Sequence, residues 1–253
     1  MIYDLQKASM LKRISAYIFD MILIVILATG FFALLSSVLH YDSYSDSLME
    51  YYDKYETEYG TTFDIDAETY NSLSEEEMQK YNDAYAALIA DEDAMRAYNM
   101  IINLTLVMLT VGILLSYAVL EFAVPLLLKN GQTVGKKIFG IAVMRTSGVK
   151  MSAVSLFIRT FLGKFTIETM IPVLIVMMIF FSVIGVVGPA ILFVLLIVEI
   201  VLMVVTRTNS ALHDILADTV TVDFSSQLIF DSEEELLEYK KKAAADKAAR
   251  QDY

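Results

Sequence analysis

Two long apolar runs stand out near the start and the middle of the chain. The first covers about residues 14–39 and is interrupted only by Asp20, and the second covers about residues 100–128 with Glu121 as its single charge. A bilayer core of about 30 Å needs about 20 helical residues, so each run is long enough to cross a membrane once. The pattern predicts a transmembrane helix in each run. The first is expected to be an uncleaved anchor, because it is too long and too polar at Asp20 for a signal peptide.

A third apolar tract, residues 166–206, is too long for one span. Gly185, Gly188 and Pro189 lie near its middle, where a turn between two helices needs such residues. We therefore predict a hairpin of two spans, about residues 168–187 and 189–205. One very long buried helix is the alternative.

The charges around these runs predict the topology. Basic residues near span ends mark the cytoplasmic side, and here they precede the first span, fill the segment between spans two and three, and follow span four: Lys7, Lys12, Arg13, Lys129, Lys136, Lys137, Arg145, Lys150, Arg159, Lys164 and Arg207. We expect a multi-pass protein of the cell membrane with both termini in the cytoplasm. The divisions expected along the chain are 1–40, 41–99, 100–128, 129–165, 166–206 and 207–253.

Composition sharpens this picture. The 253 residues are 57% hydrophobic, yet the formal net charge is −12. Residues 41–99 contain 16 acidic and 3 basic residues, whereas the other 194 residues contain 15 and 16. The acidic excess therefore belongs to one insertion, which we place outside the membrane. The chain has no cysteine, which excludes disulfides, thiolate metal sites and cysteine nucleophiles.

The acidic insertion has helical periodicity. Tyrosines recur at three- and four-residue spacing up to Tyr59, and Ser74 with Glu77 forms a capping-box signature for a second helix. Residues 60–66 are interpreted as the turn of a helical hairpin. Acidic residues from Asp64 onward loosely resemble a calcium loop, but Thr69 stands where that loop needs glycine, so we expect no metal site. The tail from Ser232 onward predicts a soluble cytoplasmic helix.

Each predicted span contains one carboxylate: Asp20, Glu121, Glu168 and Glu199. A carboxylate in hydrocarbon costs about 2.5–3.5 kcal/mol at mid-helix, so it normally faces the bundle interior or a partner. We expect all four near the cytoplasmic side, with Glu168 interfacial. Arg13 shares a helix face with Asp20, and Arg159 and Lys164 are further basic partners. Two interpretations remain open: an ion-pair network that holds helices together, and a path for protons or ions.

The segment from Gly131 to Val143 is rich in glycine and lysine. It differs from a phosphate-binding loop in spacing and has Lys137 where that loop needs Ser or Thr. We predict a juxtamembrane elbow, then a short β-hairpin of residues 141–144 and 149–151, then an interfacial amphipathic helix over 152–164. Farther on, His213 and Asp214 are adjacent and lack a second ligand nearby in sequence, so they are weak candidates for metal binding or catalysis.

Together these segments resemble the RDD family of membrane proteins. The resemblance rests on Arg13-Ile-Ser-Ala16-Tyr-Ile-Phe-Asp20, on Gly131-Gln-Thr-Val-Gly135-Lys136-Lys137-Ile-Phe-Gly140-Ile-Ala-Val143, on Arg159, and on His213-Asp214 before Thr219-Val-Thr-Val222. It covers about residues 8–40 and 100–222, and it implies that Arg13, Asp20 and Asp214 are the residues that give the family its name. Transport of unknown ligands is the usual suggestion for the family, and sodium/proton exchange has been proposed for some members. The acidic insertion and charged tail are not part of the usual pattern.

We therefore predict an all-α integral membrane four-helix bundle with an extracytoplasmic helical hairpin insertion, and no enzyme activity or cofactor. The expected function is that of a small transporter or ion/proton exchanger acting as a homo-oligomer. Its transport or ion-pair network would comprise Arg13, Asp20, Glu121, Glu199, Arg159, His213 and Asp214, and its loop motif Gly131, Gln132, Thr133, Gly135, Lys136 and Gly140. The alternative is a scaffold that binds a protein partner through the hairpin. Expected partners are the lipid bilayer and an inorganic cation or proton, with no nucleic acid.

Overall fold

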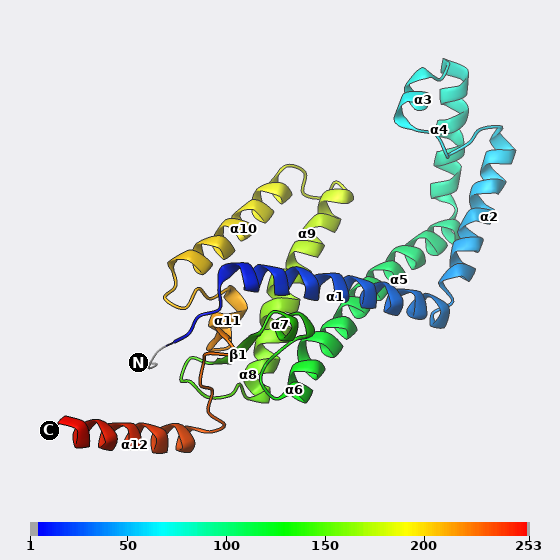
Figure 1. Cartoon of the computed structure of the whole chain (residues 1–253). Helices are drawn as coiled ribbons and strands as arrows, with labels where there is room; N and C mark the ends of the chain where they lie inside the picture. The colour runs from blue at the N-terminus through cyan, green and yellow to red at the C-terminus, as the bar shows by residue number, and fades with distance from the viewer. Residues whose placement is uncertain (1–4, 252–253) are drawn as a thin grey trace. The chain divides into compact units, whose positions relative to one another are not determined.

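The computed structural model describes residues 5–251, which form a mostly helical chain (Figure 1). Four of the helices described there are long and apolar enough to cross a membrane: Met10–Val38, Glu92–Leu128, Ala153–Phe180 and Val187–Val205. The chain divides into two compact units, residues 1–27 with 113–253 and residues 28–112. Because the boundary passes through the first two long helices, each unit is described by itself.

The helix α1 (Met10–Val38) starts in the first unit, and its buried residues, Ala16, Asp20 and Ile24, all belong to that unit. These positions recur every four residues and so lie on one face of the helix. The opposite positions, such as Leu11, Ile22 and Val25, are exposed and apolar. Such a helix matches a span that contacts protein along one narrow stripe and lipid elsewhere.

The second long helix contains α5 (Glu92–Tyr117), the π-helical segment η1 (Ala118–Ala123) and α6 (Val124–Leu128). It begins inside the range assigned from the sequence to the acidic insertion. The irregular segment has a local cause, because Pro125 has no N–H to bond the carbonyl of Glu121 four residues earlier. The carbonyl of Glu121 instead accepts a hydrogen bond from Thr160 Oγ1 at 2.8 Å.

The third long helix runs through α8 (Ala153–Phe157), the π-helical segment η2 (Ile158–Met170) and α9 (Ile171–Phe180). The helix predicted over 152–164 is therefore not a separate one, because it continues without a break into α9. Pro172 stands four residues after Glu168, as Pro125 does after Glu121. Both π-helical segments thus end two residues before a proline that removes a backbone donor.

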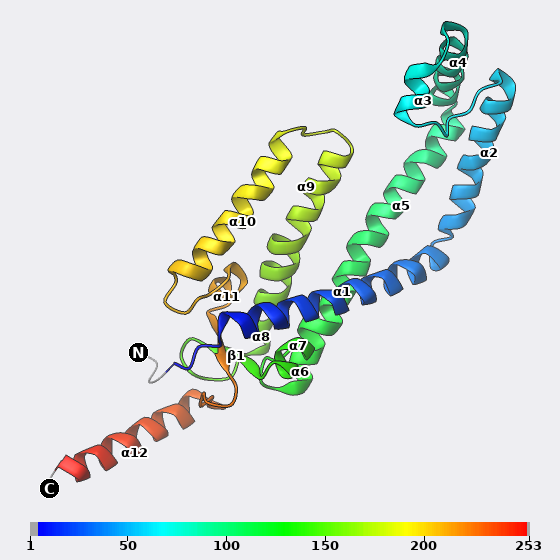
Figure 2. The ribbon, with the colours of Figure 1, turned by 45° about the horizontal axis from the view of Figure 1, so that its top comes forward.

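A turn over residues 181–186 separates α9 from α10 (Val187–Val205), and the two helices lie side by side in both views (Figures 1 and 2). The apolar tract is therefore a hairpin of two helices and not one long helix. Ser182 and Gly185 adopt positive φ angles of 58° and 46° in the turn. Gly188 packs so closely on Ile179 that an added Cβ would lie 2.4 Å from Ile179 Cγ1.

A small sheet completes the first unit. After α7 (Val134–Ile138), β1 (Ile141–Arg145) pairs antiparallel with β2 (Thr219–Asp223), which follows α11 (Leu212–Leu216). The predicted hairpin is present only as an isolated bridge between Met144 and Lys150, so β2 is the main partner of β1. The tail helix α12 (Glu233–Gln251) begins where the sequence predicts it, with Ser232 Oγ accepting from the N–H of Glu235 at 3.2 Å.

The second unit contains α2 (Tyr41–Tyr59), α3 (Ala67–Ser72) and α4 (Glu75–Ala90). Gly60 ends α2 with a φ of 67°, and the capping box of Ser74 and Glu77 is present as the sequence predicts. Tyr55, Leu88 and Ala94 form its core, with further tyrosines packed around them. Asp66 accepts from the N–H of Thr69 at 2.7 Å and so caps α3. The predicted tyrosine seam is therefore the core of a helical hairpin with a third short helix in its connection.

Candidate functional site

Asp20 on α1 accepts hydrogen bonds from the segment 131–143, which we call the glycine-lysine loop. Its Oδ1 accepts the main-chain N–H of Gly135 at 2.7 Å, and its Oδ2 accepts the hydroxyl of Thr133. A Cβ at position 135 would lie 2.5 Å from the carbonyl oxygen of Ala16 and 2.9 Å from the Asp20 carboxylate. Glycine is therefore required there so that the loop can approach α1, and Asp20 serves as its anchor.

Lys136 follows in the same loop and is buried. Its Nζ donates to Thr133 Oγ1 at 3.2 Å and lies 3.9 Å from Asp20 Oδ2. Burial, followed by the positive charge of Lys164, lowers the pKa of Lys136 to about 7, against the attraction of Glu121 and Asp20. This lysine is thus a buried group inside the protein and not a surface base.

The other loop residues serve the turn itself. Gly131 has a φ of 65°, and a Cβ there would lie 2.6 Å from the carbonyl oxygen of Val143. Gln132 Nε2 donates to the carbonyl of Ile141 at 2.8 Å, and Gly140 has a φ of 65°. These contacts connect the loop to β1, so the motif builds a structural elbow.

Asp214 on α11 is fully buried between two arginines. Arg159 Nε and Nη2 donate to its Oδ1 at 3.1 and 2.8 Å, and Arg13 Nη2 donates to its Oδ2 at 3.2 Å. Burial opposes ionisation of Asp214, but Arg159, His213 and Arg13 together hold its pKa well below the ordinary value. The three charged residues therefore join α1, η2 and α11 through one buried network.

Glu121 and Lys164 form a second buried pair. Lys164 Nζ lies 2.6 Å from Glu121 Oε2, and both side chains are less than a tenth exposed. The pair connects η1 to η2. Asp20, Glu121 and Asp214 are therefore each bonded to a neighbouring lysine, arginine or main-chain donor, which matches the ion-pair interpretation of these carboxylates.

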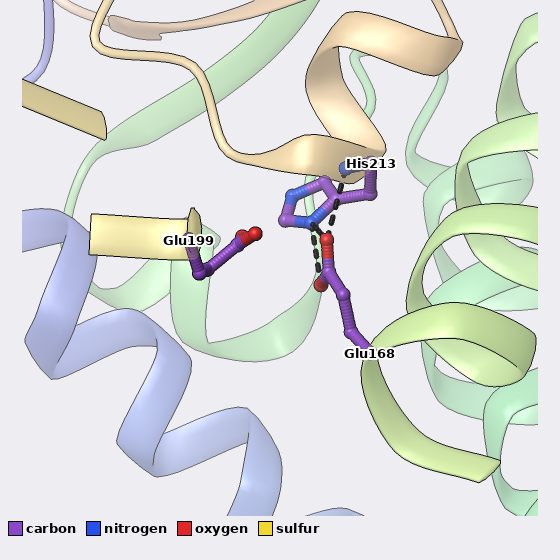
Figure 3. A group of neighbouring side chains, drawn as sticks. All are labelled: Glu168, Glu199 and His213. Atoms are coloured by element: carbon purple, nitrogen blue, oxygen red, sulfur yellow. Dashed lines mark hydrogen bonds and ion pairs between the residues drawn. The ribbon is translucent and has the colours of Figure 1, made fainter. Parts of the chain in front are cut away.

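A third group has a different composition. Glu168 from η2, Glu199 from α10 and His213 from α11 converge so that one donor atom from each lies within 4.8 Å of the others (Figure 3). His213 Nδ1 lies 2.8 Å from both carboxylate oxygens of Glu168, and the main-chain N–H of His213 donates to Glu168 Oε1 at 2.9 Å. The N–H of Leu212 donates to Glu199 Oε1 at 3.2 Å. We call these three side chains the Glu-Glu-His cluster.

The cluster depends on a close approach between η2 and α11. A Cβ at Gly163 would lie 2.5 Å from His213 Cβ, so any larger residue would push the imidazole away. Burial, above all, lowers the pKa of His213, with Arg159 acting in the same direction and Asp214 and Glu168 against it. In the described residues neither Glu168 nor Glu199 pairs with a lysine or arginine. Two carboxylates and one imidazole therefore meet in a group whose members have no lysine or arginine partner among the described residues.

The candidate residues thus fall into separate groups. Asp20, Glu121 and Glu199 were expected to share a site, but Asp20 joins the loop, Glu121 joins Lys164, and Glu199 joins His213. Glu168 was predicted to be merely interfacial, and instead it lies in the cluster. A proline follows four residues after Glu121 and four residues after Glu168. This shared spacing is the signal in the sequence that both carboxylates lie in irregular helical turns.

These features define a protein of apolar, membrane-type helices with buried charge networks between them. Comparison of the sequence with known families gives a match to the RDD family over residues 7–218. Since the match covers most of the chain, the chain belongs to the RDD family. No curated protein and no solved structure matches it.

Proposed function

We propose that the chain is a small membrane transporter that moves an inorganic cation or proton through the Glu-Glu-His cluster. The observation that carries this proposal is the contrast in charge compensation. Asp20, Glu121 and Asp214 have fixed donors, whereas Glu168 and Glu199 meet without an arginine or lysine partner in the described chain. Two neighbouring carboxylates repel each other unless a positive charge is shared between them. A mobile cation or proton supplies that charge.

The remaining networks then have a supporting role. Arg13, Arg159 and Asp214 join the helices that surround the cluster, and Glu121 with Lys164 fixes η1 against η2. Charged groups within membrane spans that are not fully compensated usually mark an ion or proton path. This assignment moves the ion-binding role from Asp20 and Glu121 to Glu168 and Glu199.

The proposal places the four spans in the cell membrane as a bundle, with both termini and the basic loop in the cytoplasm and the acidic hairpin outside. The distribution of lysine and arginine supports this orientation. The chain is proposed to act as a homo-oligomer, because α10 buries only Gly188 and leaves most of its apolar side chains exposed. A second copy and the lipid bilayer are the surfaces that would cover it.

Flux measurements test the transport function. The purified protein is reconstituted in liposomes, and uptake of inorganic cations and protons is compared for the wild type, Glu199→Gln and Glu76→Gln. Glu76 lies in the acidic hairpin and pairs with Lys80, so it is a control that removes one carboxylate away from the cluster. We expect flux in the wild type and in Glu76→Gln, and at least a tenfold loss in Glu199→Gln. Background flux in all three proteins would overturn the proposal.

A scaffold function is the second candidate. The second unit has a strongly acidic surface and a shallow pocket lined by Asp66, Tyr70, Tyr81 and Tyr85, among others, which is suited to a basic protein partner. Removal of residues 44–93 should then abolish crosslinking to that partner. Unchanged partner recovery after this deletion would exclude the hairpin as a binding module.

A further inference from the structure

We infer that Glu168, Glu199 and His213 form a binding site for a divalent first-row transition-metal ion. This inference rests on the proposed function and names the class of cation that the cluster carries. One imidazole nitrogen and two carboxylates make a mixed nitrogen and oxygen donor set. Mn²⁺, Fe²⁺, Co²⁺ and Zn²⁺ accept such a set, whereas Mg²⁺ and Ca²⁺ are usually held by oxygen alone.

The spacing of the donors fits one shared ion. Two neighbouring ligands about 2.0–2.2 Å from a metal lie about 2.8–3.6 Å apart in octahedral or tetrahedral coordination. His213 Nδ1 and the Glu168 oxygens are 2.8 Å apart, and the donors of all three residues lie within 4.8 Å of one another. Movements of a few tenths of an ångström at Glu168 and a rotamer adjustment at Glu199 would bring them around an ion.

The surroundings of the imidazole give an independent reason. A histidine that binds a metal through one ring nitrogen almost always directs its other N–H to a carboxylate or carbonyl, which fixes the ring orientation. His213 Nδ1 faces Glu168, while Nε2 lies 3.8 Å from Asp214 Oδ2. This separation is an ion-pair distance and not a hydrogen bond, and a small rotation of the ring would bring Nε2 to Asp214, which Arg159 and Arg13 already hold in place.

The ligands are also held by the backbone and remain accessible. The N–H groups of Leu212 and His213 donate to Glu199 and Glu168, so each carboxylate is oriented by the first turn of α11. Glu168 and Glu199 are half-buried, in contrast to the buried Asp20 and Glu121. An ion can therefore enter, and water can complete its coordination.

Metal binding to the full-length protein in detergent micelles tests the inference separately from transport. Co²⁺ is titrated while its visible d–d absorption is followed, and Mn²⁺ binding is measured by electron paramagnetic resonance, both with Na⁺ and Mg²⁺ in excess. We expect one saturable site in the wild type and in Glu76→Gln. Glu199→Gln and His213→Gln should each weaken binding at least tenfold.

The variants are chosen so that a folding defect does not decide the result. Gln at position 199 keeps an oxygen that accepts from the N–H of Leu212, so Glu199→Gln is the main variant if His213→Gln fails to fold. Equal binding by the wild type and Glu199→Gln would overturn the metal site. Absence of Co²⁺ and Mn²⁺ binding in a wild type that still carries Na⁺ or proton flux would also overturn it, while the transport function would stand. If the wild type binds metal and Glu199→Gln does not, but the wild type carries no cation flux, the transport function would be overturned and the metal site would stand.

Discussion

Asp20 Oδ1 accepts the main-chain N–H of Gly135 at 2.7 Å, which ties the first span to a loop 115 residues away in the chain. The contact requires that position 135 carry no side chain, because a Cβ there would lie 2.5 Å from the carbonyl oxygen of Ala16. Backbone atoms cannot move aside as a flexible side chain can. The loop and α1 therefore depend on each other for their positions.

Gly135→Ala should separate the loop from α1 and destabilise the fold severely. We expect a loss of monodisperse protein in size-exclusion chromatography and a lower thermal midpoint in detergent. Gly30→Ala is the control, since Gly30 is a helical glycine of α1 with no atom within 4 Å of an added Cβ. Alanine favours a helix by up to about 1 kcal/mol over glycine, so the control should be neutral or stabilising. Equal behaviour of the two variants would contradict the close approach at Gly135.

The buried amine of Lys136 should make stability depend on pH. Its pKa in the folded protein is lowered to about 7 from 10.5, so the unfolded chain binds more protons between these values. Stability should therefore rise with pH from about 7 to 10.5 and be lowest below 7. The charged groups that face this amine are Asp20, Glu121, Lys164 and Arg159.

Thermal midpoints at several pH values measure this effect. Lys136→Met removes the titrating amine and should flatten the rise with pH relative to the wild type. Lys137→Met serves as control, because Lys137 is the exposed neighbour in the same helix α7. If all three proteins keep parallel pH profiles, Lys136 is not the responsible group.

The sequence predicts the existence of the four long apolar helices well because they depend on local composition, but it predicts contacts between them poorly. An apolar run of about 20 residues fixes a span whatever its neighbours do, whereas Arg13 and Asp214 meet across 201 residues. The position of Glu168 was predicted wrongly because only the apolar run around it was considered. It was assigned to the start of a span, but the helix begins at Ala153 and Glu168 is well inside it.

The strand pairing was missed for a related reason. The segment 141–145 has a nearby partner across a tight turn, and the sequence favours such local pairs. The structure instead pairs it with Thr219–Asp223, because the side chains of Ala142, Met144, Val220 and Val222 form a common core. The sequences of two short apolar strands do not define which residues pair, because the pairing depends on how the intervening helices bring the strands together.

The buried pair of Glu121 and Lys164 should contribute less to stability than the loss in either single variant suggests. Lys164→Met leaves the Glu121 carboxylate buried without its 2.6 Å partner, and breaking such a pair costs about 3–5 kcal/mol in soluble proteins. The double variant Glu121→Met with Lys164→Met removes both charges and should recover most of that loss. Thermal unfolding of the singles and the double measures the coupling. Additive losses in the double variant would show that the two side chains act independently.

The absence of cysteine makes the proposed topology directly testable. Single cysteines are introduced at Asn71, in the acidic hairpin, and at Lys240, in the tail helix α12. Each is exposed to a membrane-impermeant maleimide in intact cells and again after permeabilisation. Residues 129–165 contain seven lysines and arginines and no acidic residue, and this basic loop predicts that Asn71→Cys reacts in intact cells and Lys240→Cys only after permeabilisation. The reverse pattern would invert the protein in the membrane, and labelling of both positions in intact cells would show that an even number of spans lies between them, not the three expected. Either result would place the cluster of Glu168, Glu199 and His213 on a different side from the one that the charge distribution indicates.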